Sequence, residues 1–184
     1  MTRIIAGVYG GRRLAAPNGR DTRPTLDRVR EALFSTLAAV TEIDGCRFVD
    51  LYAGSGAVGL EAASRGASAV LLVESDPSAA RVIRTNIATL GLGGTCQLST
   101  ARVGTVLATA PAQPYQIVFA DPPYGMDDQE VSVMLTALVA WLAPDGWVVV
   151  ERSTRTAEPT WPDGVTPERG RRYGESTLWY GRRS

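Results

Sequence analysis

The stretch RFVDLYAGSGAVGLEAASRG, residues 47–66, carries the strongest signal for the fold of this chain. It begins with an apolar run typical of a buried strand, continues into a glycine-rich turn at residues 54–59, and ends in a helical pattern at about residues 58–65. Glycine permits positive φ angles and close approach of the backbone to a ligand, and a helix N-terminus presents free N–H groups. The stretch therefore predicts a strand, a ligand-binding turn and a helix of an α/β domain.

The same alternation continues toward the C-terminus. Further strands are expected at AVLLVE (69–74), TCQLS (95–99), YQIVFAD (115–121) and GWVVVER (146–152), and further helices at about 77–90, 103–108 and 129–142. Because these strands are apolar throughout and helices connect them, we expect a doubly wound, mostly parallel, Rossmann-like sheet covered on both faces. Two strand-like segments around Gly174 predict an antiparallel hairpin at the sheet edge.

Two elements are expected before this body. RIIAGVYGGRRLAAP, residues 3–17, predicts a short hairpin with its turn at Gly10 and Gly11. RPTLDRVREALFSTLAAV, residues 23–40, has apolar residues at helical spacing and predicts a helix with Thr25 as its N-cap. We therefore divide the chain into a small basic β-hairpin extension, residues 1–22, and one α/β domain, residues 23–184.

The composition limits the chemistry of the chain. Its 184 residues, 45% hydrophobic and 21% charged, are typical of one globular domain, and neither a membrane span nor a signal peptide is evident. We expect a cytoplasmic monomer. The two cysteines have no metal-ligand spacing, so we predict that they are small buried side chains. Histidine is absent, and we expect no metal.

Arginine is distributed unevenly. All 19 basic residues are arginine; residues 1–30 carry a net charge of +5, residues 31–149 a net charge of −7, and residues 150–184 a net charge of +2. A basic arm on an acidic body suggests an anionic partner, because the guanidinium fork matches a phosphate group. A solvated surface, or a genome that favours arginine, would give the same composition.

A carboxylate pattern surrounds the glycine-rich turn. Glu74 follows Gly54 by twenty residues and ends the next strand, where a carboxylate can accept both hydroxyls of a ribose. Dinucleotides and S-adenosylmethionine (SAM) both use such a site. Asp50, immediately before the turn, would repel a pyrophosphate but can face the ammonium and sulfonium end of SAM. This arrangement favours SAM.

DPPYG, residues 121–125, directly follows an apolar strand. Two consecutive prolines stiffen the turn and donate no hydrogen bonds, so it offers acceptors, from the Asp121 carboxylate and the Pro122 carbonyl, beside the Tyr124 ring. A planar ligand with an exocyclic NH₂ group fits this arrangement, its N–H groups on the two oxygens and its ring on the tyrosine. Acceptors at both hydrogens stabilise positive charge on an attacking amine. The turn therefore predicts methylation of a nucleobase amine.

With both motifs located, the chain resembles class I SAM-dependent methyltransferases, whose amino-methylating members carry Asp/Asn-Pro-Pro-Tyr/Phe. It resembles more closely the bacterial RsmD family, which methylates guanine N2 of 16S ribosomal RNA at guanine 966. The motifs that carry this resemblance are RIIAGVYGGRRL, TRPTLDRVREALF, DLYAGSGAVGLEA, VESD, IVFADPPY and RRYGESTLWYGRR. One departure is Thr100, since the family often has Asn or Asp before the alanine at position 101.

The resemblance implies roles for individual residues. It implies cofactor contacts by Asp50, Ala53, Gly54, Ser55, Gly56, Gly59, Glu74, Ser75, Thr100 and Ala101. It implies that Asp121, Pro122 and Tyr124 hold the guanine, and that RNA is bound by Arg3, Arg12, Arg13, Arg20, Arg23, Arg28 and Arg30. The partner it implies is 16S ribosomal RNA, and we expect the substrate to be this RNA in the assembled small ribosomal subunit.

Three alternatives remain. A DNA adenine-N6 methyltransferase would use the same turn chemistry but usually carries a target-recognition domain for which this chain has no room. A protein-glutamine methyltransferase typically has Asn first in the turn and less need of a basic arm. A SAM-fold RNA-binding module without activity would have a degraded loop or turn, and both are intact in this sequence.

Overall fold

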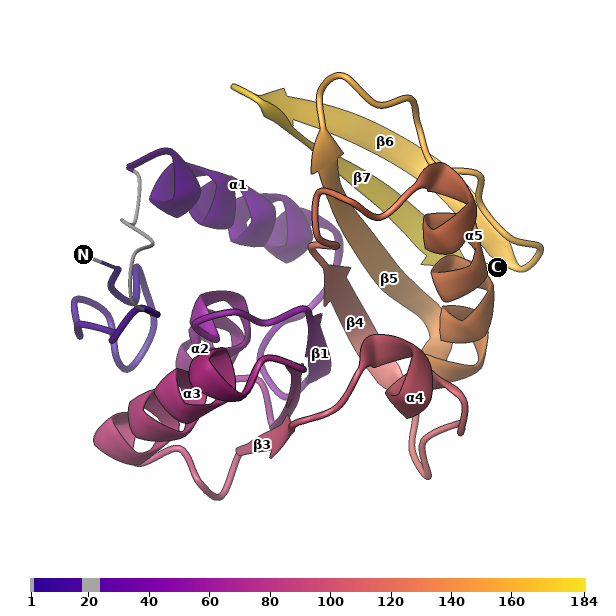
Figure 1. Cartoon of the computed structure of the whole chain (residues 1–184). Helices are drawn as coiled ribbons and strands as arrows, with labels where there is room; N and C mark the ends of the chain where they lie inside the picture. The colour runs from indigo at the N-terminus through magenta and orange to yellow at the C-terminus, as the bar shows by residue number, and fades with distance from the viewer. Residues whose placement is uncertain (1, 18–23) are drawn as a thin grey trace.

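A computed structural model describes residues 2–17 and 24–184. Figure 1 shows one sheet with helices on both faces. The elements are α1 (Pro24–Val40), β1 (Arg47–Leu51), α2 (Ala57–Ser64), β2 (Ala69–Val73), α3 (Pro77–Leu90), β3 (Cys96–Ser99), α4 (Val103–Leu107), β4 (Tyr115–Ala120), α5 (Asp128–Leu138), the 3₁₀ turn η1 (Val139–Trp141), β5 (Leu142–Ser153), β6 (Val165–Tyr173) and β7 (Ser176–Arg183). The predicted alternation of strands and helices is confirmed.

In residues 2–17 and 24–184, seven strands form the sheet, in the order β3-β2-β1-β4-β5-β7-β6. Strands β1 to β5 are parallel, and β7 pairs antiparallel with both β5 and β6. The strand order therefore has a topological switch point between β1 and β4. At such a point the loops that follow the two strands separate and leave a crevice for ligands at the carboxyl ends of the strands. The expected antiparallel hairpin at the edge is confirmed, with Gly174 in its turn at φ 58°.

Alternate strand residues bury into two cores. In β1, Phe48 packs in the core that α1, α2 and α3 cover, and Val49 packs in the core that α4 and α5 cover. This division follows from the strand period of two, which sends successive side chains to opposite faces. Cys46 and Cys96 are buried, as predicted, and burial raises the pKa of each thiol to about 12.

The N-terminal arm, residues 2–17, is a short antiparallel hairpin with a wider loop than the expected turn at Gly10 and Gly11. Arg3 bridges Arg13, and the Leu14 N–H donates to the Thr2 carbonyl at 2.9 Å. The arm is also held by the body: Ile4 and Leu14 are buried in the core beside α1 and α2. The apolar residues of the arm gain more by packing on these helices than by extending a two-stranded ribbon. That residues 1–22 are an RNA-binding extension stays a prediction.

Two helix boundaries also differ from expectation. Helix α1 begins at Pro24, so Thr25 lies inside the helix rather than at its N-cap. Helix α5 ends at Leu138, and Leu142, expected at the end of this helix, begins β5. Pro144 and the positive φ of Asp145, 61°, are incompatible with a longer helix. No helix in the described ranges is long and apolar enough to cross a membrane.

Candidate active site

The glycine loop, residues 53–59, follows β1 and includes the first residues of α2. Gly54 and Gly56 have φ angles of 59° and 81°, which a residue with a Cβ adopts at a cost. Gly56 is the N-cap of α2. The Ala53 N–H donates to the Val73 carbonyl at 3.0 Å, which places the loop against the end of β2. The loop thus turns the N–H groups of the first turn of α2 toward the carboxyl edge of the sheet.

Asp50 lies beneath this loop. Its side chain is 2% exposed, and Oδ2 accepts the Gly59 N–H at 2.8 Å. Burial raises the pKa of Asp50 to about 8, while the Gly59 N–H acts in the opposite direction. That Asp50 also faces the ammonium and sulfonium end of the cofactor stays a prediction. Its Oδ2 satisfies an internal donor, and Asp50 thereby fixes the shape of the loop.

Asp50→Asn tests this role through the pH dependence of stability. Because the folded-state pKa is raised, the contribution of Asp50 to the free energy of unfolding is present below pH 4 and is lost as the pH rises toward 8, by up to about 1.4 kcal/mol per pH unit. Asparagine does not titrate and keeps an acceptor for Gly59. Urea unfolding between pH 4 and 8 is expected to show a flatter profile for the variant.

The control for the loss of one carboxylate is Asp163→Asn, at an exposed position. If Asp50→Asn and the wild type lose stability equally between pH 4 and 8, Asp50 is ionised throughout this range in the folded protein.

Glu74 joins the loop to the end of β2. Its Oε2 accepts the Gly54 N–H at 2.8 Å, and its Oε1 accepts the Asp76 N–H at 2.9 Å. Both oxygens therefore keep a fixed position although the side chain is partly exposed. The expected juxtaposition of this carboxylate with the glycine loop is present.

The DPPYG turn lies beside the glycine loop. Leu51, the last residue of β1, pairs in register with Ala120, the last residue of β4, so the two loops leave adjacent strands at the same level. Pro122 is buried, whereas Tyr124 is 90% exposed. The Met126 N–H donates to the Pro123 carbonyl at 3.0 Å and closes the turn. A buried proline anchors the turn and leaves the tyrosine ring open to a planar ligand.

A cavity of about 290 Å³ joins these parts. The residues that line it come from the ends of β1, β2 and β4 and from the start of α4; they are Tyr52, Val73, Glu74, Ser75, Arg102, Val103, Gly104 and Pro123. The cavity has the size and the mixed polar and apolar lining of a nucleoside site. It brings Glu74 and Ser75 together with the DPPYG turn. In the part of the chain that the structure describes, no cluster of His, Cys, Asp and Glu could hold a metal ion.

Thr100 and Ala101 lie just outside this lining, before α4. The Thr100 hydroxyl is exposed and accepts a hydrogen bond from Arg84 Nη2 at 2.9 Å. The residues that border the cavity at this point are Arg102 and Val103. A hydroxyl that already has a partner on α3 is a weaker adenine contact than the family's amide or carboxylate. The predicted contacts of Thr100 and Ala101 stay predictions.

Two residues of this region were missed by sequence reasoning. Tyr52 has a φ of 59°, and its hydroxyl lies 3.5 Å from the sulfur atoms of Met126 and Met134; burial raises its pKa to about 12. Buried Asn86 on α3 donates to the Ser55 carbonyl at 3.0 Å and so supports the glycine loop. A polar residue in the apolar stripe of α3 was the signal that could have revealed Asn86.

The expected RNA-binding arginines do not all lie on the surface. Arg3, Arg12, Arg13 and Arg28 are exposed, whereas Arg20 and Arg23 lie outside the described residues. Arg30, 5% exposed, was wrongly assigned: its guanidinium donates to the Arg3 carbonyl and pairs with Asp27 at 3.3 Å. Its Nε lies 3.5 Å from Oε2 of Glu61, which is fully buried. Arg30 therefore joins α1, α2 and the arm, and cannot reach a phosphate.

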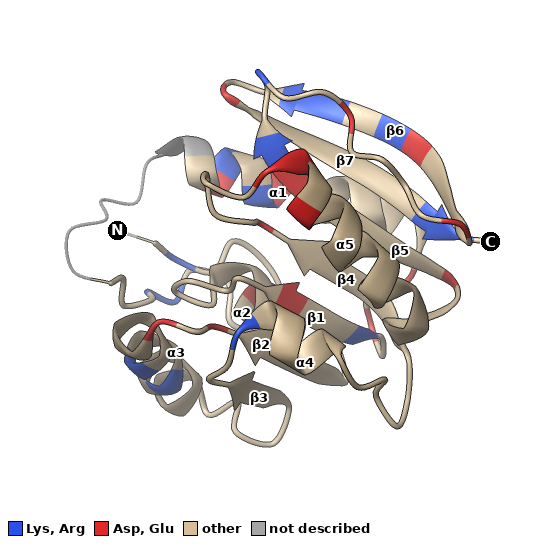
Figure 2. Cartoon of the chain, turned by 45° about the vertical axis from the view of Figure 1, so that its right-hand side comes forward, with Lys and Arg blue, Asp and Glu red and all other residues tan. Residues whose placement is uncertain are grey.

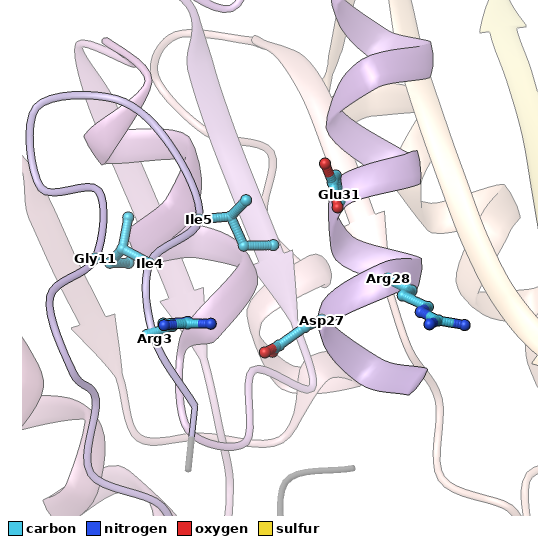
Figure 3. A pocket seen from close by; sticks show the side chains of 7 residues that line it. All are labelled: Arg3, Ile4, Ile5, Gly11, Asp27, Arg28 and Glu31. Atoms are coloured by element: carbon cyan, nitrogen blue, oxygen red, sulfur yellow. The ribbon is translucent and has the colours of Figure 1, made fainter. Parts of the chain in front are cut away.

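A second cavity, of about 310 Å³, lies between the N-terminal arm and α1. Figure 3 shows Arg3 from the arm and Asp27 from α1 pointing toward one another across it, whereas Arg28 points away from the arm. Glu31 also lines this cavity. Because its charges are of both signs, the cavity is not a basic channel, and it shares no lining residue with the cavity at Glu74.

Three comparisons place this geometry among known proteins. A family model described as "Conserved hypothetical protein 95" matches residues 2–182. The chain is 39% identical to the Escherichia coli Ribosomal RNA small subunit methyltransferase D over 160 residues, which is 87% of this chain and 79% of the relative. A solved Escherichia coli structure, yhhF, has a TM-score of 0.87 at 33% identity and covers 99% of this chain and 97% of its own.

The magnesium protoporphyrin IX methyltransferase of Synechocystis, solved with bound SAM, shares the fold, with a TM-score of 0.70 at 14% identity over 90% of this chain and 87% of its own. Fold, glycine loop and relatives define a SAM-dependent methyltransferase of class I. Within that class, the chain belongs to the RsmD family.

Proposed function

We propose that this chain transfers a methyl group from SAM to the exocyclic N2 amine of a guanine in 16S ribosomal RNA, at guanine 966. The observation that carries the proposal is the position of the DPPYG turn beside the glycine loop, at one edge of the sheet. The name of the Escherichia coli relative, a small subunit ribosomal RNA methyltransferase, supports RNA as the substrate.

The residues present fit SAM at the cavity beside Glu74. Gly54 leaves room for a ligand near the loop, because a Cβ added there would meet no other atom within 4 Å. A Cβ added at Gly56 would instead press on the Leu72 side chain at 3.1 Å, so this glycine serves the packing of the loop. In this proposal the Glu74 carboxylate accepts the ribose hydroxyls, and Ser75 borders the adenine. When bound, SAM supplies a methyl group on a sulfonium, which is a good leaving group.

The DPPYG turn would hold the guanine. The Asp121 carboxylate and the Pro122 carbonyl accept the two N–H groups of the amine, while the guanine ring stacks on Tyr124. Such an amine is a poor nucleophile because its lone pair is delocalised into the ring. The two acceptors orient the lone pair and stabilise the positive charge that develops on nitrogen, and Asp121 takes the proton that the nitrogen loses.

The exposed arginines of the arm and α1 would bind the RNA backbone. Arg3, Arg12, Arg13 and Arg28 have no ion-pair partner among the described residues and are exposed. An RNA already folded in the small ribosomal subunit presents such a backbone in a fixed shape. We therefore propose the small subunit, in the cytoplasm, as the substrate of a monomeric enzyme.

The test is methyl transfer from labelled SAM to small ribosomal subunits, to naked 16S RNA and to duplex DNA, followed by nucleoside analysis. N2-methylguanosine is expected from subunits or 16S RNA, because the turn and the arginines together select a nucleobase amine in an RNA. Subunits isolated from cells that lack the corresponding gene ensure that the target guanine is unmodified. Methylated adenine in DNA, or no nucleic-acid product despite SAM binding, would contradict the proposal.

A further inference from the structure

The outer strand of the sheet, β6, carries three arginines that have no role in the site described above. Arg169, Arg171 and Arg172, here called the β6 arginine row, are all exposed. None of them takes part in an ion pair found among the described residues. Figure 2 shows basic residues recurring along β6. Guanidinium groups on an edge strand either hinder pairing with other strands or bind an anion.

A bulge in β6 decides which charges share one face. Pro167 pairs with Gly181 and Arg169 with Tyr180, so two steps on β6 match one step on β7, and Glu168 has no partner. Without this bulge Glu168 would stand opposite Tyr180. The bulge therefore puts an arginine in place of an acid at this position in the sheet.

The register places the row at the edge of the sheet that holds the active site. Ala120 of β4 is joined through Val150 and Trp179 to Gly170 of β6 in one row of paired residues. Asp121 is one residue beyond Ala120, and Arg171 is one residue beyond Gly170. Three strand spacings separate β4 from β6, about 14 Å, a span that an RNA strand crosses in a few nucleotides.

Two arginines of the row lie on the side of the sheet that α1 covers. Arg171 pairs with Leu178 and Arg169 with Tyr180, and cross-strand partners share a face. Leu178 and Tyr180 are buried in the core beside α1. Arg169 and Arg171 therefore extend from the same face as α1, while Arg172 extends from the other face of the exposed edge strand.

We propose that the β6 arginine row binds the sugar-phosphate backbone of the RNA beside the target nucleotide. This inference rests on the proposed function, and it adds a second basic surface across the active site from the N-terminal arm. The RNA would then be held on both sides of the DPPYG turn. An RNA backbone that is bound at two places holds one nucleotide at Asp121, and the row needs no base-specific contacts for this.

The test uses Arg171→Gln/Arg172→Gln in the full chain, with binding to 16S RNA measured between 50 and 200 mM salt, the range in which phosphate contacts show their effect. For each phosphate contact removed, the slope of log affinity against log salt is expected to fall by about 0.7 to 0.9, and affinity at 0.1 M salt by about five- to tenfold. KM for the RNA should rise in proportion, with kcat unchanged, because the row touches no reacting atom. SAM binding should be unchanged.

The matched control is Arg182→Gln, compared with Arg171→Gln alone. Arg182 belongs to the same hairpin but pairs with Asp145 at 2.8 Å and lies opposite Trp147, near the start of β5, away from the active edge. Loss of RNA affinity in Arg171→Gln, with wild-type affinity in Arg182→Gln, supports the proposal.

Two results would overturn it in different ways. If the wild type methylates RNA and the double variant keeps wild-type affinity and salt slope, the row does not bind RNA, while the proposed function stands; self-association of that variant would show that the row only protects the edge strand. If the wild type methylates no RNA, the proposed function fails and this inference fails with it.

Discussion

Asp121→Ala is expected to lower the rate of methyl transfer by about two to four orders of magnitude, the range measured for removing a general base or an electrostatic stabiliser. The substitution removes one of the two proposed acceptors at the amine and the group that takes its proton. SAM affinity is expected to stay at the wild-type level, because Asp121 is not among the residues that line the cavity at Glu74. Single-turnover methyl transfer and calorimetric titration with SAM measure the two quantities separately.

The conservative variant Asp121→Asn sharpens this test. Asparagine keeps an oxygen acceptor for the amine but not the negative charge, so its rate is expected to lie between those of the wild type and Asp121→Ala. The opposite pattern, a loss of SAM affinity with a normal rate at saturating SAM, would move Asp121 into the cofactor site and contradict the proposed role.

Glu74→Ala is expected to weaken SAM binding by about a hundredfold or more. The carboxylate holds the Gly54 and Asp76 N–H groups, and in the proposal it also accepts the ribose hydroxyls. Hydrogen bonds to charged groups contribute about 1.5 to 3 kcal/mol each, and 1.4 kcal/mol corresponds to a factor of ten in affinity. The loss of two such bonds to the ribose therefore accounts for the expected effect, which calorimetric titration with SAM measures.

Glu74→Gln separates the ligand contact from the support of the loop. Glutamine keeps one acceptor oxygen and two donors, so an intermediate SAM affinity is expected. Glu42→Ala, at an exposed glutamate beyond α1, controls for the lost charge. Wild-type SAM affinity in Glu74→Ala, with an unchanged urea midpoint, would show that the ribose does not lie at this carboxylate.

Most of the fold could be predicted because the strands are buried on both faces. The runs that form β2 and β4 are apolar at nearly every position, and only a covered parallel sheet buries such runs. Helix α3 was predicted from Pro77 to Leu90 and has these bounds, since a proline at its start and Gly91 after its end are strong local signals. The N-terminal hairpin was less predictable, because Ile4 and Leu14 pack on helices that are distant in sequence.

The site was predictable in its types of residue and less so in their roles. The cofactor SAM was inferred in part from Asp50 and is confirmed by the relatives, whereas the burial of Asp50 and its bond to the Gly59 N–H were not foreseen. Arg30 shows the same limit. Helical periodicity does not reveal that a charged residue meets buried Glu61 of another helix, and an arginine count therefore overstates the surface charge.

The doubly wound sheet, the glycine loop, Glu74 and the DPPYG turn could be predicted from local patterns, because glycine, proline and apolar residues fix where strands end and loops begin. Which side chains at those ends are buried, and which face outward, depends on tertiary packing. Packing between segments far apart in the chain buries Asp50 and Arg30 and brings Asn86 to the Ser55 carbonyl. The register of the strands places Arg171 at the same level of the sheet as Asp121. No local pattern encodes these contacts, since each results from how whole strands and helices align.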